Sequence, residues 1–147
     1  PIETTLQLAD IVASAMPPAE RRKNKNPSRR TFQALRIAVN HELDALEEGL
    51  DTIFDHLAPG GRLCVITFHS LEDRIVKKFF EAAANPASCI DPRLPLLPSQ
   101  LPQPLFNRAV RILPSEKECE ENPRARSSVL RGASRTDAPW PEQGVQV

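Results

Sequence analysis

Eight apolar residues recur at steps of three and four between Arg30 and Leu57. This spacing places them on one face of an α-helix, so the sequence predicts a single amphipathic helix roughly 40 Å long. Basic residues gather at its start and acidic residues in its second half, the reverse of the order that the helix dipole favours. We therefore expect the basic start to face an anionic partner outside the helix. The apolar stripe consists of Phe32, Leu35, Val39, Leu43, Leu46, Leu50, Ile53 and Leu57.

The highest local density of positive charge lies at and before the start of this helix. Six basic side chains and no acidic one fall within residues 21–30, in a chain whose 19 Lys+Arg balance 19 Asp+Glu. Low apolarity and Pro27 predict a loop here. A local excess of positive charge suits contact with nucleic-acid phosphates, and a solvated surface loop is the alternative. The candidate binding residues are Arg21, Arg22, Lys23, Lys25, Arg29 and Arg30, and a weaker second cluster contains Arg124, Arg126, Arg131 and Arg135.

An apolar run from Leu63 to Phe68 follows a turn at Gly60-Gly61. The nearly continuous run predicts a short strand buried on both faces, as in a parallel sheet, with Cys64 in the core. Ser70 then resembles a helix N-cap, with Asp73 in place of the usual glutamate of a capping box. Helix, glycine turn, strand and helix form one repeat of a doubly wound α/β sheet. Such a strand needs parallel neighbours, which this sequence does not obviously contain.

The remaining segments have simpler patterns. An amphipathic helix is predicted from Thr4 to Ala15, because Pro17-Pro18 cannot continue it. Six prolines within residues 85–104 predict an extended connection without regular structure. Strands are predicted over 107–113 and 127–131, and between them a short acidic helix begins at Ser115, with Glu118 completing a capping box.

His69 and Ser70 follow the predicted strand directly. In open α/β sheets, ligands bind outside the carboxyl ends of the strands, so these two side chains are candidate pocket residues. The alternatives are an ordinary turn residue for His69 and a helix cap for Ser70. His41 and His56 lie on charged helix faces and are expected at the solvated surface. Gly60-Gly61 precedes the strand instead of joining a strand to a helix, so we expect a turn there and not a phosphate loop.

Several classes of protein are disfavoured by composition. Three cysteines without a Cys-x-x-Cys pair argue against a zinc cage and a disulfide framework, and they favour a reducing compartment. No metal site, Walker motif or nucleophile elbow is predicted. No apolar stretch approaches 18 residues, so no transmembrane helix is predicted. The chain opens on Pro1 without a signal-peptide pattern, and we expect it to be part of a longer protein.

Four blocks of sequence are more specific than any helix or strand pattern. They are residues 30–43 (RTFQALRIAVNHEL), 58–63 (APGGRL), 68–77 (FHSLEDRIVK), and 114–116 (PSE) followed by 121–131 (ENPRARSSVLR). In this order they resemble the bacterial ribosomal RNA small-subunit methyltransferase H family, also called MraW. The resemblance covers about residues 1–136. That family transfers a methyl group from S-adenosylmethionine to N4 of a cytidine in small-subunit ribosomal RNA.

The resemblance implies an α/β fold, namely the C-terminal part of a Rossmann-like class I methyltransferase sheet plus the end of an inserted helical domain. It assigns residues 1–27 to the end of the helical domain and the basic loop, 28–136 to the C-terminal half of the methyltransferase domain, and 137–147 to a disordered tail. The family's glycine-rich cofactor loop lies upstream of the first residue here. The S-adenosylmethionine site is therefore expected mainly outside this chain, and the chain alone is expected to be inactive.

The partner implied by the resemblance is small-subunit ribosomal RNA or the ribosomal subunit, in the cytoplasm or an organelle and without a membrane. Two departures stand out. The family usually has His-Pro where this chain has Asn26-Pro27, so a titrating imidazole is lost while hydrogen bonding can persist. Gly132 replaces a residue that favours β-structure. A free-standing RNA-binding module without catalytic activity is the alternative, and a glycine-rich loop encoded upstream of Pro1 would exclude it.

Overall fold

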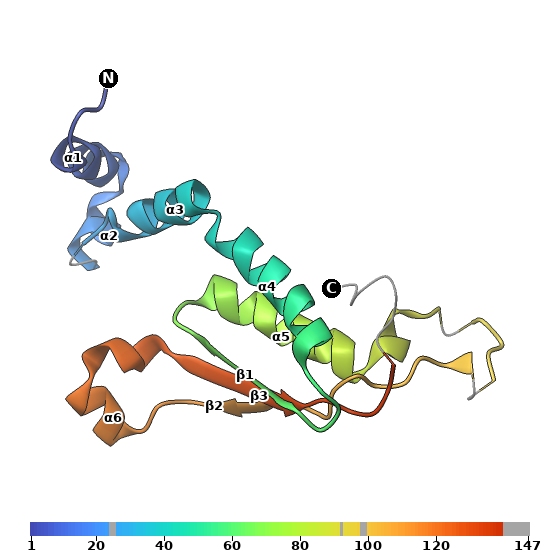
Figure 1. Ribbon diagram of the computed structural model, residues 1–147. Coiled ribbons are helices and arrows are strands. Elements are labelled where there is room, and N and C mark those ends of the chain that lie inside the picture. The colour runs from blue at the N-terminus through green and yellow to red at the C-terminus, as the bar shows by residue number, and fades with distance from the viewer. Residues whose placement is uncertain (24–25, 92, 98–99, 140–147) are drawn as a thin grey trace. The chain divides into compact units, whose positions relative to one another are not determined.

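The structure is a computed structural model that describes residues 1–23, 26–91, 93–97 and 100–139 (Figure 1). The chain forms two compact units, one of residues 1–44 and one from Ala45 onward. The domain boundaries expected from the sequence remain predictions. Of the expected tail, residues 140–147 lie outside the described part of the chain, whereas Ala138 is buried in the core of the second unit.

The first unit begins with two short helices. α1 (Thr5–Ala15) has the predicted bounds, and Thr4 caps it because its hydroxyl accepts the Gln7 N–H at 3.2 Å. α2 (Pro18–Lys23) starts on a proline, which is pre-set for the first turn of a helix and needs no N–H there. The loop predicted over residues 21–30 is therefore wrong at both ends. Its first three residues belong to α2, and Arg29 already begins α3.

The single helix predicted from Arg30 to Leu57 is two helices, α3 (Arg29–Asn40) and α4 (Glu42–His56). His41 separates them in the left-handed conformation, with φ 52° and ψ 39°, and its N–H bonds to the Ile37 carbonyl. Glu42 and Asp44 therefore lie in the first turn of α4, where the helix dipole favours acidic side chains. In one long helix these acidic residues would oppose the helix dipole. At the start of α4 they agree with it.

The second unit contains a small sheet and the helix α5 (Ser70–Ala84). The sheet contains β1 (Arg62–Thr67), β2 (Val110–Ile112) and β3 (Val129–Ser134) in the order β1-β3-β2, and β3 runs antiparallel to both neighbours. As the sequence indicates, the described residues contain no parallel neighbour that pairs with β1, because the chain returns through β3 and pairs beside β1 in the opposite direction. The other described elements after α5 are η1 (Pro86–Cys89), α6 (Glu116–Glu121) and η3 (Pro123–Ser127).

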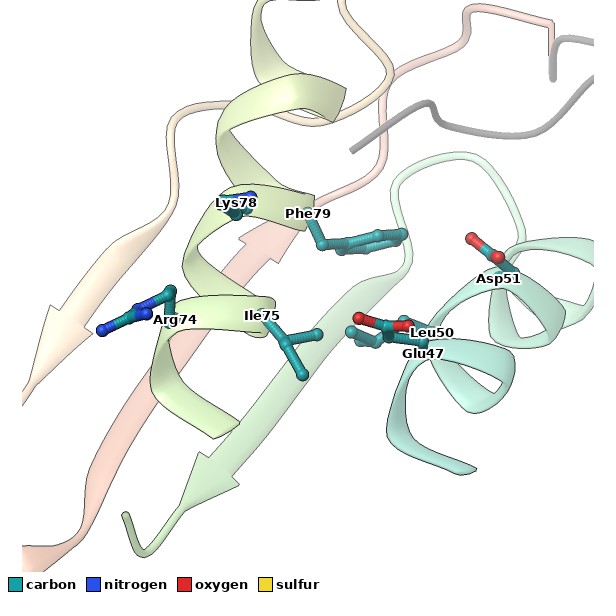
Figure 2. A pocket seen from close by; sticks show the side chains of 7 residues that line it. All are labelled: Glu47, Leu50, Asp51, Arg74, Ile75, Lys78 and Phe79. Carbon is teal, nitrogen blue, oxygen red and sulfur yellow. The ribbon is translucent and has the colours of Figure 1, made fainter. Parts of the chain in front are cut away.

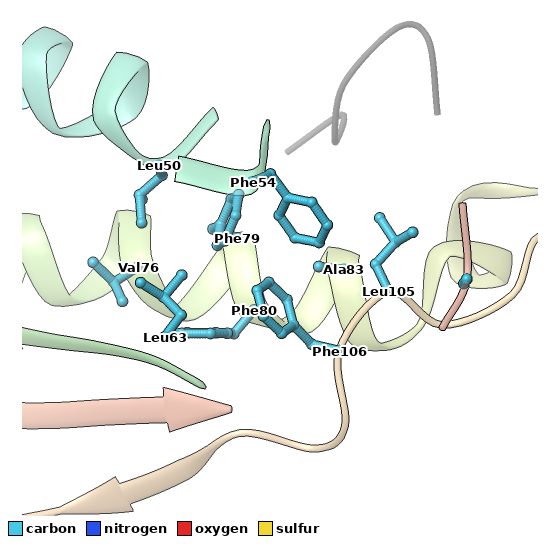
Figure 3. Close-up of a cluster of buried hydrophobic side chains, with 10 residues drawn as sticks. Leu50, Phe54, Leu63, Val76, Phe79, Phe80, Ala83, Leu105 and Phe106 are labelled. Atoms are coloured by element: carbon cyan, nitrogen blue, oxygen red, sulfur yellow. The ribbon is translucent and has the colours of Figure 1, made fainter. Parts of the chain in front are cut away.

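The core lies between α4, α5 and one face of the sheet (Figure 3). Phe106 is fully buried at its centre, with ring centroids 4.8 Å from Phe54 and 5.4 Å from Phe80. Phe54 lies outside the predicted apolar stripe, whereas Val39, on the stripe, is 76% exposed. Leu105 and Phe106 directly follow the proline-rich connection predicted over residues 85–104, and both belong to the core.

β1 is buried on one face only. Leu63 and Thr67 are buried, while Cys64 and Ile66 between them are exposed. The prediction of a strand buried on both faces, with Cys64 in the core, is therefore wrong, because α5 covers only one side of the sheet. The turn at Gly60-Gly61 is confirmed, with Gly60 at φ 76°. The cap of the acidic helix is also confirmed, since the Ser115 hydroxyl accepts the Glu118 N–H at 3.2 Å.

Candidate site at the carboxyl end of β1

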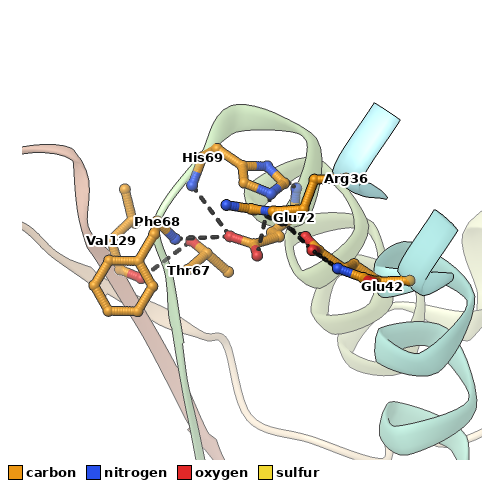
Figure 4. A network of polar contacts seen from close by, with 8 residues as sticks. Arg36, Glu42, Thr67, Phe68, His69, Glu72 and Val129 are labelled. Carbon is orange, nitrogen blue, oxygen red and sulfur yellow. Dashed lines mark hydrogen bonds and ion pairs between the residues drawn. The ribbon is translucent and has the colours of Figure 1, made fainter. Parts of the chain in front are cut away.

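The candidate site is the turn that joins β1 to α5 (Figure 4). β1 ends at Thr67, whose hydroxyl donates a hydrogen bond to the Val129 carbonyl of β3 at 3.2 Å. Phe68 follows with 56% of its surface exposed. His69 is extended, with φ −143° and ψ 162°, and it is the N-cap of α5. The predicted cap, Ser70, is instead the first, exposed residue of the helix.

His69 and Glu72 hold the turn through reciprocal hydrogen bonds. His69 Nδ1 accepts the Glu72 N–H at 3.3 Å, and Glu72 Oε2 accepts the N–H groups of Phe68 at 2.8 Å and His69 at 3.1 Å. Because Nδ1 is an acceptor, the neutral ring carries its hydrogen on Nε2. Nε2 is buried without a hydrogen bond in the described structure, although Glu72 Oε1 lies 3.2 Å away. The backbone turn is thus fixed from both sides.

Glu72 was not singled out from the sequence, although its spacing carried a signal. A capping box pairs the N-cap with the third helical residue, and His69 and Glu72 have this spacing. Histidine is an uncommon N-cap, so the sequence favours Ser70 and predicts the capping box one residue too late. In the structure the N-cap is His69.

An ion pair attaches the first turn of α5 to the sheet. Arg131 of β3 donates to Asp73 through Nε at 2.7 Å and Nη2 at 3.1 Å, a bidentate arrangement. This hydrogen bonding holds the pKa of the Asp73 carboxyl below its usual value, although burial acts in the opposite direction. The same contact raises the pKa of Arg131. Arg131, which the sequence placed in the second basic cluster, is therefore a structural residue.

Arg135, another member of the second basic cluster, is also a structural residue. Its guanidinium lies over the Phe54 ring, 5.1 Å from the centroid, and donates to the carbonyls of Phe54 and Leu57. These carbonyls end α4, and a cation there satisfies acceptors that the helix leaves open. The contact fixes the end of α4 to the segment that follows β3.

The other two members, Arg124 and Arg126, remain exposed on η3. The buried Ala125 between them anchors this turn. Because Thr67 pairs with Val129, η3 enters β3 at the same end of the sheet at which β1 leaves for α5. The structure thus brings two exposed arginines to the sheet end that carries Phe68 and His69.

The basic segment 21–30 belongs to the first unit. Arg29 and Arg30 are exposed at the start of α3. Arg21 is exposed too, and its guanidinium donates to the Ser14 and Met16 carbonyls at 3.4 and 3.1 Å, which caps the end of α1. Only the backbones of Arg22 and Lys23 are described, in α2, and Lys25 lies outside the described residues.

The Asn26-Pro27 departure lies in the same segment. Asn26 Oδ1 accepts a hydrogen bond at 2.9 Å from the hydroxyl of Ser28, which is only 4% exposed. A hydrogen-bonding role at position 26 is therefore present without an imidazole.

A separate pocket of about 310 Å³ lies between α4 and α5 (Figure 2). Its floor is apolar, its α4 wall carries two carboxylates and its α5 wall two cations. None of the sequence-predicted site residues lines it. The lining residues are Glu47, Leu50, Asp51, Arg74, Ile75, Lys78 and Phe79.

Two kinds of feature are absent from the described part of the chain. Its histidines, cysteines and carboxylates form no group of three that could hold a metal ion. None of its helices has the length and apolarity needed to cross a membrane.

The sequence of this chain is similar to those of one known protein family. The model of the MraW methylase family matches residues 1–136. A protein named ribosomal RNA small subunit methyltransferase H from Bordetella avium (strain 197N) is 49% identical over 146 residues, which are 99% of this chain and 40% of that protein. Proteins of the same name from Herminiimonas arsenicoxydans and Ralstonia pickettii (strain 12J) are 52% and 51% identical, over 42% and 43% of their lengths. This chain spans about two fifths of such relatives. It belongs to the MraW methylase family.

Proposed function

We propose that this chain is the C-terminal part of a longer enzyme that methylates N4 of a cytidine in small-subunit ribosomal RNA, with S-adenosylmethionine as methyl donor. The name shared by the relatives supports ribosomal RNA of the small subunit as the substrate. The strand order is consistent with the closing strands of a Rossmann-like sheet. β1 and β2 run parallel to each other with β3 reversed between them, so strands from the rest of the protein would extend the sheet beyond β1.

The residues described here do not fit the methyl donor by themselves. Cofactor-binding turns in such sheets use glycines and unpaired N–H groups at a helix N-terminus. The turn from β1 to α5 contains no glycine, and the N–H groups of Phe68, His69 and Glu72 already bond within the turn. We therefore assign the cofactor site mainly to the part of the enzyme outside this chain.

The chain's own contribution follows from what the cytidine amine needs. Its lone pair is delocalised into the ring, so the amine must be held in line with the methyl donor and its N–H groups must meet oxygen acceptors. The base must also leave its stack. The exposed ring of Phe68 offers a stacking surface, and the exposed Ser70 hydroxyl offers an acceptor beside it. Glu72 holds the Phe68 backbone by accepting its N–H, and His69 caps the helix that begins at Ser70.

RNA phosphates would meet the exposed guanidinium groups on this chain. Arg124 and Arg126 lie at the same sheet end as Phe68, and Arg29 and Arg30 form an exposed pair in the first unit. Arginine can bind phosphate through two parallel hydrogen bonds. The observation that carries the proposal is this gathering of an exposed aromatic ring, a fixed histidine turn and two exposed arginines at one end of the sheet.

The test uses a joined protein, in which this chain is fused to the part of the Bordetella avium relative that lies outside the match. His69→Asn keeps an N-cap acceptor, so its melting temperature should stay close to that of the unsubstituted protein. If the imidazole lines the cytidine pocket, methyl transfer should fall by tenfold or more, which corresponds to about 1.4 kcal/mol of transition-state stabilisation. His69→Ala removes the cap as well and should lower both quantities. Normal turnover with His69→Asn would make His69 only a cap and would overturn the pocket assignment.

A further inference from the structure

The side of the sheet that faces α5 carries one arginine that the candidate site does not include. Arg111 is the middle residue of β2, and it pairs directly with Arg131 of β3. Residues opposite each other on antiparallel strands point to the same face of the sheet. Because Arg131 reaches Asp73 on α5, Arg111 also points to the α5 side. It is nevertheless exposed, and β2 is an edge strand of the described sheet.

The acidic side chains near Arg111 already have partners. Asp73 accepts two hydrogen bonds from Arg131, at 2.7 and 3.1 Å, and Glu81 lies 3.5 Å from Lys77. Hydrogen bonding by Arg131 is the largest cause that lowers the pKa of Asp73, and the nearby charge of Arg111 adds to this effect. Arg111 itself forms no hydrogen bond or ion pair within the described part of the chain. It is therefore a surplus positive charge on this side of the sheet.

This surplus charge is unfavourable in the chain alone. Like charges directly opposite each other on neighbouring strands destabilise a sheet, and Arg111 faces Arg131 in this way. The Asp73 carboxylate bonds only to Arg131, so a second anionic group would be needed to relieve the repulsion at Arg111. A phosphate suits this role, because a planar guanidinium can donate two parallel hydrogen bonds to it. The alternative is a solvated arginine that protects the sheet edge from pairing with another chain.

Arg111 lies close to the end of the sheet to which the cytidine pocket is assigned. Thr67 pairs with Val129, the first residue of β3, and Arg111 lies opposite the third. At about 3.4 Å per residue along a strand and about 4.8 Å between strands, Arg111 lies roughly 12 Å from the end of β1. An RNA strand spans such a distance in a few nucleotides. Arg124 and Arg126 are exposed on η3, which enters β3 at this end.

We propose that Arg111 is a further RNA-binding residue of the methyltransferase and holds a backbone phosphate a few nucleotides away from the cytidine. The proposal rests on the proposed function, since it takes small-subunit ribosomal RNA as the substrate. The RNA strand passes from Arg124 and Arg126 by the first turn of α5 to the edge strand β2. Arg111 contacts no reacting atom, so it contributes to the binding of RNA and not to the transfer of the methyl group.

Arg108 provides a matched control on the same segment. It is exposed as well, but Ala109 packs against the core, so the alternation of side chains points Arg108 away from the α5 side. Arg111→Gln and Arg108→Gln in the joined protein therefore remove the same charge from opposite sides of one strand. Binding is measured by filter assay across a salt series, with small-subunit ribosomal RNA freed of protein.

Arg111→Gln should lower the slope of log affinity against log salt by about 0.7 and weaken binding at low salt by about fivefold or more. Arg108→Gln should leave the slope and the affinity unchanged. Arg111→Lys keeps the charge and should restore the slope. In methyl transfer to intact small subunits, Arg111→Gln should raise KM and leave kcat unchanged. The melting temperatures of all three variants should stay near that of the unsubstituted protein.

A slope that Arg111→Gln leaves unchanged, or lowers only as much as Arg108→Gln does, would overturn the proposal and make Arg111 a solvated edge residue. A melting temperature that falls with Arg111→Gln, with normal RNA binding per folded molecule, would also overturn it, because Arg111 would then only support Asp73. RNA binding does not require methyl transfer. A joined protein whose slope depends on Arg111 but which forms no N4-methylcytidine would therefore contradict the proposed function alone.

Discussion

A residue of the site can stabilise the fold and line a pocket at once, and a sequence pattern cannot separate these two roles. His69 was predicted to line a pocket, and it is also the N-cap of α5 through its Nδ1 atom. The position after the strand was readable from the apolar run. The capping role could not be predicted, because it depends on the extended backbone of His69. It also depends on the Glu72 carboxylate, which accepts the N–H groups of Phe68 and His69. Similarly, nothing local in the sequence pairs Arg131 with Asp73, 58 positions away.

The Asp73–Arg131 pair predicts a dependence of stability on pH. The pKa of Asp73 is lower in the folded chain than in the unfolded one, so its stabilisation is complete above the unfolded pKa and is lost as pH falls through the folded pKa. Asp73→Asn should therefore lower the free energy of unfolding by roughly 2 kcal/mol at neutral pH. The difference between variant and unsubstituted chain should shrink below about pH 4. Urea unfolding at several pH values measures this.

An exposed ion pair provides the control for that prediction. Lys117 and Glu121 lie 3.8 Å apart with side chains 84% and 69% exposed, so Glu121→Gln should change the stability by less than about 0.5 kcal/mol. A loss for Asp73→Asn as small as that of the control, or one that persists unchanged at acidic pH, would show that the pair does not hold α5 to β3.

At the scale of elements, the helices were largely predictable and their junctions were not. The period of the apolar stripe predicted helical structure on both sides of His41 and missed the break. The charge order contained the signal for it, because acidic residues in the middle of a supposed single helix are well placed at the start of a new one. The antiparallel pairing of β1 with β3 joins Thr67 to Val129, and a local pattern cannot show such distant pairing.

The left-handed backbone of His41 predicts how substitutions there behave. This conformation costs a non-glycine residue roughly 1–2 kcal/mol and is least tolerated by β-branched side chains. We expect His41→Gly to leave the chain as stable or stabilise it by up to about 1 kcal/mol, and His41→Val to destabilise it by about 1 kcal/mol or more. Urea unfolding followed by circular dichroism measures both.

His56→Val serves as the matched control, since His56 is also exposed but ends a regular helix. It should cost only a few tenths of a kcal/mol through helix propensity. If His41→Val instead matched His56→Val in stability and raised the helix content, α3 and α4 would have merged into one helix and the break at His41 would not be intrinsic to the fold.

For the molecule as a whole, the family was recognisable from four blocks of sequence, and the match over residues 1–136 confirms it. Pattern reasoning alone gave an α/β class and a basic segment. It overestimated the burial of β1, because an apolar run looks the same whether its second face is covered within the chain or left open. Two members of the second basic cluster, Arg124 and Arg126, are exposed and can contact RNA. The other two, Arg131 and Arg135, make contacts within the fold.

RNA binding by the whole joined protein should depend on Arg29 and Arg30. Each phosphate contact that is lost reduces the slope of log affinity against log salt by about 0.7 for single-stranded RNA. Arg29→Gln with Arg30→Gln should therefore lower the slope by about 1.4 and weaken binding to ribosomal RNA at low salt. Filter binding across a salt series measures this.

The control removes two positive charges elsewhere, by Lys77→Gln with Lys117→Gln, from exposed side chains that belong to ion pairs on α5 and α6. Its slope should stay near that of the unsubstituted protein. Equal slopes for all three proteins would leave Arg29 and Arg30 as solvated surface residues.

Mass spectrometry of nucleosides, after small ribosomal subunits are incubated with S-adenosylmethionine and the joined protein, decides whether this chain completes a cytidine-N4 methyltransferase. The unmethylated subunits should gain N4-methylcytidine with the joined protein and no methylated nucleoside with the isolated chain, which should also show no micromolar binding of S-adenosylmethionine by calorimetry. A folded joined protein that binds the methyl donor yet forms no N4-methylcytidine, or an isolated chain that forms it alone, would contradict the proposed division of the enzyme.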